Sequence, residues 1–284
     1  MSASTAYDVS LCDEASAACP ICAAAVPQVG LSKYGKISVP VLHCRACDVY
    51  IRALDSGLRE QQLLSASYVR LENEPRFWEQ RHDFFEHILQ LAADRIDGGS
   101  RRLLDVGCSY GHLLEIARNR GFAVEGIESN EELVRLCNSK GLKVVGQASN
   151  VSAPADVITF IDSLYCFSQP IEILEQARDL LTARGLVIIR VTNRNWLARL
   201  RAKTLHNCEY TLLGDTAVSY SVRGITRLLE VSGLSVMSIL VDGGVGKHVG
   251  WKSRIMYRTT RLATALTLDS TFLTPGIIVL ARRT

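Results

Sequence analysis

The chain has 284 residues, of which 48% are hydrophobic and 21% are charged, and its formal net charge is +3. This composition excludes a disordered, collagenous or strongly charged chain, and the weak charge does not indicate a dedicated nucleic-acid binder. The length suits one full domain and a smaller one, because typical domains have ~100–200 residues. No apolar run reaches about 18 residues, and the first residues lack the pattern of a signal peptide. We therefore expect a cytoplasmic protein without a transmembrane segment.

Nine cysteines are present, and five of them are scattered through apparently regular elements, unlike the cysteines of a secreted disulfide framework. These five are Cys12, Cys108, Cys137, Cys166 and Cys208. The remaining cysteines form two C-x2-C pairs, Cys19 with Cys22 and Cys44 with Cys47, and 21 residues separate the pairs. This spacing is typical of a tetrahedral zinc site with four thiolate ligands.

A zinc ion would also explain how a segment of about 45 residues, too small for a core of its own, could fold. The alternative is a pair of redox-active dithiols. It is less favoured, because neither pair opens a helix within a βαβ pattern as a thioredoxin-like motif would. We predict a zinc-ribbon-like module over residues 1–54 that binds structural Zn²⁺.

A charged helical connector is predicted over residues 55–100. Apolar residues from Phe77 to Ala92 recur at spacings of 3, 4 and 7, which indicates an amphipathic helix. Pro75 suits the first turn of this helix, and we expect the helix to continue to about Ile96.

From residue 101 onward, strand-like and helix-like segments alternate. The strand-like runs are RRLLDVGC, AVEGIES, LKVVGQ, ADVITFID and LVIIRVTN, with helical stretches near 111–120, 130–140 and 170–182. This alternation is typical of an α/β domain with a doubly wound, mostly parallel sheet. We place this Rossmann-like domain at residues 101–284.

The last part of the domain contains a polar and basic insertion over 194–220, a helix over 221–233, and strands over 234–243 and 276–283. Its basic residues could pair with a phosphate or carboxylate on a substrate, a carrier or a membrane surface, or they could form an ordinary solvated face. RNA is less favoured as a partner, because no aromatic stacking pattern is interleaved with the charges. The basic residues are Arg194, Arg199, Arg201, Lys203, Lys247, Lys252, Arg254, Arg258 and Arg261.

The loop LLDVGCSYGHLLEIA joins a buried strand to a helix, through Gly107, Ser109 and Gly111. It would place backbone N–H groups and the Asp105 carboxylate at the carboxyl end of the first strand of the domain. A dinucleotide would require G-x-G-x-x-G, but Ser109 and His112 replace the second and third glycines. Close approach of a pyrophosphate is therefore poorly supported.

A second interpretation of the same loop is the nucleophile elbow of a serine hydrolase. Gly107 to Gly111 matches G-x-S-x-G literally, with Ser109 as the nucleophile. This alternative is disfavoured because an elbow needs earlier strands that carry an oxyanion loop, whereas this strand is the first of its domain.

A third interpretation is an adenosyl cofactor that carries a sulfonium instead of a pyrophosphate. Asp105 could hold its ammonium group, and the small residues Gly107, Ser109 and Gly111 would let the cofactor lie against the backbone. A second carboxylate should then bind the ribose hydroxyls at the end of the next strand, and Glu128 stands there, 21 residues after Gly107.

These motifs resemble those of the class I S-adenosylmethionine-dependent methyltransferases, over roughly residues 75–284. The resemblance implies a seven-stranded sheet whose last strand is antiparallel. It implies S-adenosyl-L-methionine as cofactor, with Glu128 on the ribose, Ser149 or Asn150 near the adenine, and Asp162 at the end of the fourth strand. SVRGITRLLEVSGLSVMSI is similar to the ubiquinone-biosynthesis branch, and zinc-ribbon-like modules precede such domains in sugar and natural-product pathways.

Methyl transfer is an in-line displacement, so much of the catalysis can come from proximity and orientation, with a base needed only where the acceptor loses a proton. The candidate bases are Asp162, Tyr165, His206 and His248. Many relatives carry Glu-His where this chain has Tyr165-Cys166, so no family base can be carried over at those positions. His248 is preferred because the glycine-rich segment VDGGVGKHVGW suits a loop that closes over a substrate.

The sequence therefore predicts a methyltransferase that acts on a small-molecule acceptor, such as a sugar, a nucleotide-linked compound or a natural product. The acceptor could be phosphorylated or carrier-linked. One alternative is a methyltransferase directed at RNA or protein, which the zinc module would dock. Another is a noncatalytic scaffold that binds the cofactor, since a general base is not evident.

Overall fold

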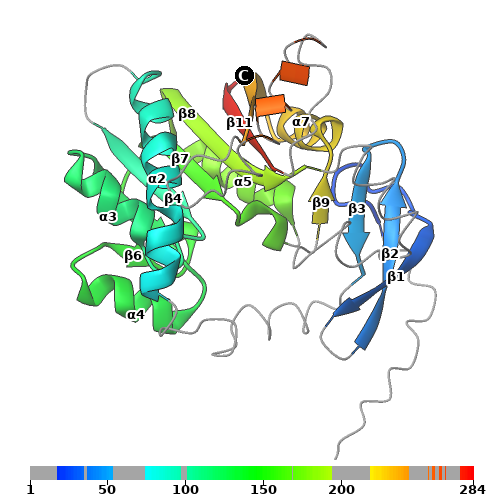
Figure 1. Cartoon of the computed structure of the whole chain (residues 1–284), viewed down its shortest axis with the longest axis horizontal. Coiled ribbons are helices and arrows are strands. Elements are labelled where there is room, and N and C mark those ends of the chain that lie inside the picture. Colours follow the sequence, from blue (N-terminus) through cyan, green and yellow to red (C-terminus); the bar gives the residue numbers. More distant parts are fainter. Residues whose placement is uncertain are drawn as a thin grey trace, which may run out of the picture.

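The computed structural model describes most of the chain in seven segments. These are residues 18–34, 37–53, 74–96, 101–167, 169–193, 218–242 and 276–284, together with a few positions between 255 and 266. The strands of these segments form two sheets, a large one at the centre of the molecule and a small one at its side (Figure 1).

The large sheet has seven strands in the order β10-β11-β8-β7-β4-β5-β6. Its strands are β4 (Arg102–Val106), β5 (Ala123–Ile127), β6 (Val144–Val145), β7 (Ala155–Ile161), β8 (Leu181–Thr192), β10 (Leu234–Val241) and β11 (Gly276–Arg283). β6, β5, β4, β7 and β8 run parallel, whereas β11 is antiparallel to both β8 and β10. The predicted doubly wound sheet with an antiparallel last strand is thereby confirmed.

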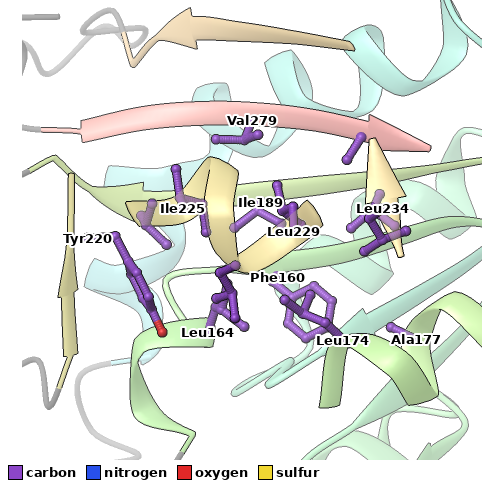
Figure 2. Packing of buried hydrophobic residues seen from close by; sticks show 14 of the residues in the cluster. Phe160, Leu164, Leu174, Ala177, Ile189, Tyr220, Ile225, Leu229, Leu234 and Val279 are labelled. Carbon is purple, nitrogen blue, oxygen red and sulfur yellow. The ribbon is translucent and has the colours of Figure 1, made fainter. Parts of the chain in front are cut away.

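Helices cover both faces of this sheet. They are α2 (Glu74–Ala93), α3 (His112–Asn119), α4 (Glu131–Ser139), α5 (Pro170–Leu180) and α7 (Val222–Val231). One hydrophobic cluster joins α2, α3 and α4 to one face, and a second cluster joins α5 and α7 to the other. Figure 2 shows the second cluster, in which Leu174 of α5 and Leu229 of α7 pack over Phe160 and Ile189 of the sheet.

The helix boundaries follow local signals. The Asn130 side chain accepts hydrogen bonds from the amides of Glu132 and Leu133 and so caps α4, and Pro170 stands in the first turn of α5. The predicted helix over 170–182 ends two residues early, because β8 begins at Leu181. Among the helices that the structure describes, none has the length and apolar character needed to cross a bilayer.

The small sheet is antiparallel, with the order β1-β2-β3-β9. Its strands are β1 (Gln28–Tyr34), β2 (Ile37–Cys44), β3 (Val49–Arg52) and β9 (Val218–Tyr220). β9 belongs to the stretch 194–220, for which the sequence predicted only a polar insertion, so that prediction was wrong at residues 218–220. A strand of three residues is too short to show periodicity, and it forms because the exposed edge of β3 offers unpaired backbone groups.

β9 joins the amino-terminal segment to the later part of the chain. In sequence it lies between β8 and α7, yet it pairs with β3, with Val49 opposite Tyr220. One hydrophobic cluster extends from Cys19 and Val49 of the amino-terminal segment to Phe160 of the large sheet. The division into 1–54, 55–100 and 101–284 stays a prediction, but residues 218–220 share a sheet with the first of these units.

The first turn of α7 packs closely on the turn that joins β2 to β3. A Cβ atom at Gly224 would lie 2.6 Å from Cγ1 of Val49, 3.0 Å from the carbonyl oxygen of Cys47 and 3.2 Å from that of Asp48. A glycine is therefore needed here for close approach of two backbones, although it lies inside a helix.

This contact predicts that Gly224→Ala destabilises the protein, which is the opposite of the usual effect of this substitution inside a helix. At a permissive helix position, replacing glycine by alanine stabilises the helix by up to ~1 kcal/mol. Here we expect the free energy of unfolding to fall by about 1–3 kcal/mol, because the added methyl group overpacks the contact. Urea denaturation measures the change, and Arg223→Ala, an exposed neighbour in the same turn, is the matched control. A stabilised Gly224→Ala protein would contradict the packing described above.

Candidate active site

The glycine-rich loop after β4 contains residues in the left-handed conformation. Gly107 has φ 79, Ser109 φ 50 and Gly111 φ 78. At Gly107 a Cβ atom would lie 2.5 Å from the Cβ of Ser163, so glycine is required there for space as well as for conformation. Gly111 lies beneath the loop as the N-cap of α3, where a Cβ would meet Leu142.

Glu128, directly after β5, holds this loop in place. Its Oε2 accepts a hydrogen bond from the amide of Ser109 at 2.9 Å, and its Oε1 accepts one from the amide of Asn130 at 2.9 Å. A carboxylate oxygen accepts more than one hydrogen bond, so both oxygens keep capacity for a ligand. The predicted acidic position therefore joins the glycine loop to the start of α4.

A cavity of about 1110 Å³ opens at the carboxyl ends of the parallel strands. Of the residues predicted for the cofactor, Gly107, Ser109, Glu128, Ser149 and Asp162 line it. Tyr165, Cys166 and Phe167 line it as well, after the end of β7. Pockets for a single small molecule are typically ~300–1,000 Å³, so this cavity has room for a cofactor and a second molecule.

Asp105 lies beside this cavity, at the end of β4. Only 4% of it is exposed, and the hydroxyl of Thr159 donates a hydrogen bond of 2.6 Å to its Oδ1. Burial raises the pKa of Asp105 to about 7, and the Thr159 hydrogen bond offsets this only in part. Asp105 lines a small adjoining cavity together with Gly107 and Arg81, and it is not part of the lining of the large cavity.

Asp162 has φ 58 and lies at the centre of a chain of ion pairs. Arg81 of α2 binds one of its carboxylate oxygens and Arg190 of β8 binds the other. Arg190 also donates to Oδ2 of Asp242, at 2.6 and 2.9 Å. Since both oxygens of Asp162 are engaged by guanidinium groups, the geometry favours a part in shaping the cavity over proton transfer.

Arg81, Arg190 and Asp242 were missed in the sequence. Arg190 and Asp242 interrupt or follow the apolar runs of β8 and β10, and a charge in such a run indicates a buried partner. That signal could have identified them as a pair. Arg81 carries no comparable signal, because it is one of several charges on the amphipathic helix α2.

Of the predicted catalytic residues, Asp162 and Tyr165 line the same cavity. Tyr165 belongs to the short 3-10 helix η3 (Leu164–Cys166). His248, and His206 with it, lie outside the residues that the structure describes.

The four paired cysteines converge at the edge of the small sheet. Their sulfur atoms lie within 4.8 Å of one another, and the Sγ atoms of Cys22 and Cys44 are 3.7 Å apart. A tetrahedral zinc site with Zn–S distances of ~2.3 Å requires sulfur separations of about 3.8 Å. Burial raises the pKa of the Cys19 thiol to about 11, and a divalent cation would supply the charge that stabilises the thiolates. The residues therefore fit a metal ion.

Comparison with known proteins identifies the family. A family model described as a methyltransferase domain matches residues 77–239, which is more than half of the chain. The chain belongs to this family. The matched region of the chain contains the glycine loop, Glu128 and the cavity wall at Tyr165.

Individual relatives agree with this assignment. A ubiquinone biosynthesis O-methyltransferase of Azoarcus sp. (strain BH72) is 29% identical over 187 residues, which cover 58% of this chain and 79% of that protein. The crystal structure of the plantazolicin methyltransferase BamL matches with a TM-score of 0.53 at 19% identity, over 80% of this chain and 97% of that one. An S-adenosylmethionine-dependent methyltransferase from Clostridium acetobutylicum ATCC 824 matches with a TM-score of 0.52 at 13% identity, over 75% and 98%.

At these identities the structural likenesses show the fold, while the family match shows the activity. The protein is an S-adenosylmethionine-dependent methyltransferase, as the resemblance implied. The serine hydrolase suggested by the literal G-x-S-x-G pattern finds no support in the family match, and Ser109 takes part in the site through its backbone amide.

The role of Glu128 in the methyltransferase can be tested by Glu128→Ala. Hydrogen bonds to a charged group are worth ~1.5–3 kcal/mol, so we expect the affinity for S-adenosylmethionine to fall about 10- to 100-fold. Calorimetric titration measures the affinity. Glu131→Ala removes an exposed carboxylate from the first turn of the neighbouring helix and should leave the affinity unchanged. Equal losses in the two variants would contradict a specific role for Glu128.

The raised pKa of Asp105 predicts a pH dependence. Because the pKa of about 7 in the folded protein lies above the ordinary value of 3.8, the folded protein holds the proton of the Asp105 carboxyl more tightly than the unfolded chain. The ligand-free protein should therefore lose stability as pH rises from about 4 to about 7.

A cofactor ammonium favours the Asp105 carboxylate, so cofactor affinity should rise between about pH 6 and about pH 8. Titrations across this range in the wild type and in Asp105→Asn check the expectation, because the variant should bind more weakly and lose the dependence. A pH dependence of the same size in Asp105→Asn would assign it to another group.

Proposed function

We propose that the methyltransferase acts on a small-molecule acceptor of a biosynthetic pathway, such as a sugar, a nucleotide-linked compound or a natural product. The observation that carries the proposal is the cavity of about 1110 Å³, in which the glycine loop and Glu128 share a lining with Tyr165, Cys166 and Phe167. The names of the relatives support it, since one is named for ubiquinone biosynthesis and another for plantazolicin.

The cofactor supplies the methyl group, and the chain's own residues would orient it. Glu128 would accept hydrogen bonds from the ribose hydroxyls, and Ser149, in the short helix after β6, would meet the adenine, since both line the cavity. Asp105 would hold the ammonium group. Arg81 would meet the carboxylate of the same methionyl end, since it lines both cavities beside Gly107.

The acceptor would then lie against η3. Its orientation toward the sulfonium would provide most of the catalysis, because an in-line displacement depends on the alignment of the reacting atoms. Where the acceptor must lose a proton, Tyr165 is the candidate that the structure places at the cavity, and His248 stays a candidate from the sequence. Asp162 is less suited, since both of its oxygens bind arginines.

We also propose that Cys19, Cys22, Cys44 and Cys47 bind one structural Zn²⁺. Four thiolates complete a tetrahedral site and leave no position open for catalysis. We also propose a cytoplasmic location, because five of the nine cysteines are scattered through the sequence, unlike those of a secreted disulfide framework. A phosphorylated or carrier-linked acceptor and peripheral membrane contact stay predictions, because most of the basic residues behind them lie outside the described segments.

The proposed function is tested by titrating the zinc-loaded protein with S-adenosylmethionine and then offering acceptors with a labelled methyl group. We expect micromolar binding, and label transfer to one of a panel of sugars, nucleotide-linked compounds and natural products. Glu128→Ala is the control for cofactor dependence. Transfer to RNA or protein with none to the panel would favour the macromolecule-directed alternative, and binding without transfer to either would favour a scaffold.

A further inference from the structure

β9 lies between the cysteine module and the wall of the active-site cavity. On one side its Tyr220 pairs with Val49 of β3, only two residues after Cys47. On the other side Tyr220 packs in the large hydrophobic cluster. Figure 2 shows its ring near Leu164, in the cluster that also contains Ile225 of α7. Tyr220 is fully buried, so a displacement of β9 would affect both neighbours.

Leu164 is the first residue of η3, and the residues that follow it line the cavity. Tyr165 and Cys166 both belong to this lining, whereas the Leu164 side chain points into the cluster and is fully buried. The amide of Cys166 donates a hydrogen bond of 2.9 Å to the carbonyl of Ser163, which closes the turn. The wall is therefore anchored to the protein through Leu164 and its neighbour Tyr220.

The cofactor side of the cavity is anchored differently. The glycine loop is held by Glu128, and Cys108 of that loop packs with Leu113 and Val144 in the cluster on the opposite face of the sheet. Among the described residues, this cluster, which joins α2, α3 and α4 to the sheet, contains none from the segment 18–53. Val106 and Ile127, on the strands that lead into the cofactor side, also pack in the cluster that contains Cys19 and Val49, so the cofactor side has a second anchor in addition to the one it shares with the module.

We propose that the metal ion bound by the four cysteines positions the η3 wall of the cavity, through β3 and β9, and affects the cofactor side of the cavity less. The proposal rests on the metal site proposed above. A bound ion would fix the turn over Cys44–Asp48, against which β3 and the first turn of α7 pack. Without the ion, β9, a strand of three residues, would lose a rigid partner.

Hydrogen exchange of the full-length protein, with and without metal, tests this coupling. Zinc content is measured first, and the metal is then removed with a chelator. We expect clearly faster exchange in peptides that cover 18–53, 218–231 and 163–167, and a smaller change in peptides that cover 102–119 and 123–139. The affinity for S-adenosylhomocysteine should change little.

Three results would overturn the proposal. Faster exchange confined to 18–53 would show that the module is not coupled to the wall. Equal acceleration in 102–139 would show that the cofactor side depends on the metal as well. Absence of bound metal in the purified protein would contradict the proposed metal site. Lost cofactor binding in the metal-loaded protein would instead contradict the methyltransferase site, so the two failures are distinguishable.

Gly224→Ala disturbs the same contact without touching a cysteine. In the metal-loaded variant we expect faster exchange over 163–167 and 218–231 at full zinc content, because the added methyl group pushes α7 away from the Cys44–Asp48 turn. Arg223→Ala is the control and should exchange like the wild type. Unchanged exchange over 163–167 in Gly224→Ala would contradict transmission through this contact.

Discussion

The active site depends on one backbone constraint, the left-handed turn after β4. Gly107 and Ser109 both adopt positive φ, and the amide of Ser109 is thereby directed to Glu128. The turn cannot relax toward Ser163, because Ser163 donates its hydroxyl to the carbonyl of Val106 at 2.5 Å and occupies the space beside Gly107. The ends of β4, β5 and β7 are thus held together, and the residues proposed for the cofactor take their positions from this arrangement.

The charges around the turn fall into two groups with different environments. Asp105 has a neutral hydroxyl as its hydrogen-bond partner, so burial raises its pKa and leaves it receptive to a cation. Asp162 has two arginine partners, so its charge is already balanced. The two carboxylates, at neighbouring strand ends, therefore differ in what they can bind. This difference suits a cofactor that carries an ammonium group, which Asp105 would bind, and a carboxylate, which would compete with Asp162 for Arg81.

The parts of the structure that could be predicted are those with local signals. Apolar runs predicted the strands of the large sheet, the glycine-rich motif predicted the loop after β4 with Glu128 beside it, and the C-x2-C spacing predicted the cysteine cluster. β9 could not be predicted, because its three residues are a strand only where the edge of β3 is present. The ion pairs of Arg81, Asp162 and Arg190 join three elements that are distant in the chain, and only the tertiary fold brings them together.

The pairing of β9 with β3 also changes how the amino-terminal module should be regarded. A module tethered only by a linker would contribute a surface, and its loss would leave the catalytic domain intact. Here the module shares a sheet with residues 218–220 and a hydrophobic core with Phe160 and Leu164. Because Gly224 has no side chain, α7 approaches the carbonyl oxygen of Cys47 closely, and the backbones of the two parts pack directly on each other. The cysteine cluster is therefore part of the framework that supports the η3 wall of the cavity, and this framework combines residues from the segments 18–53 and 218–231.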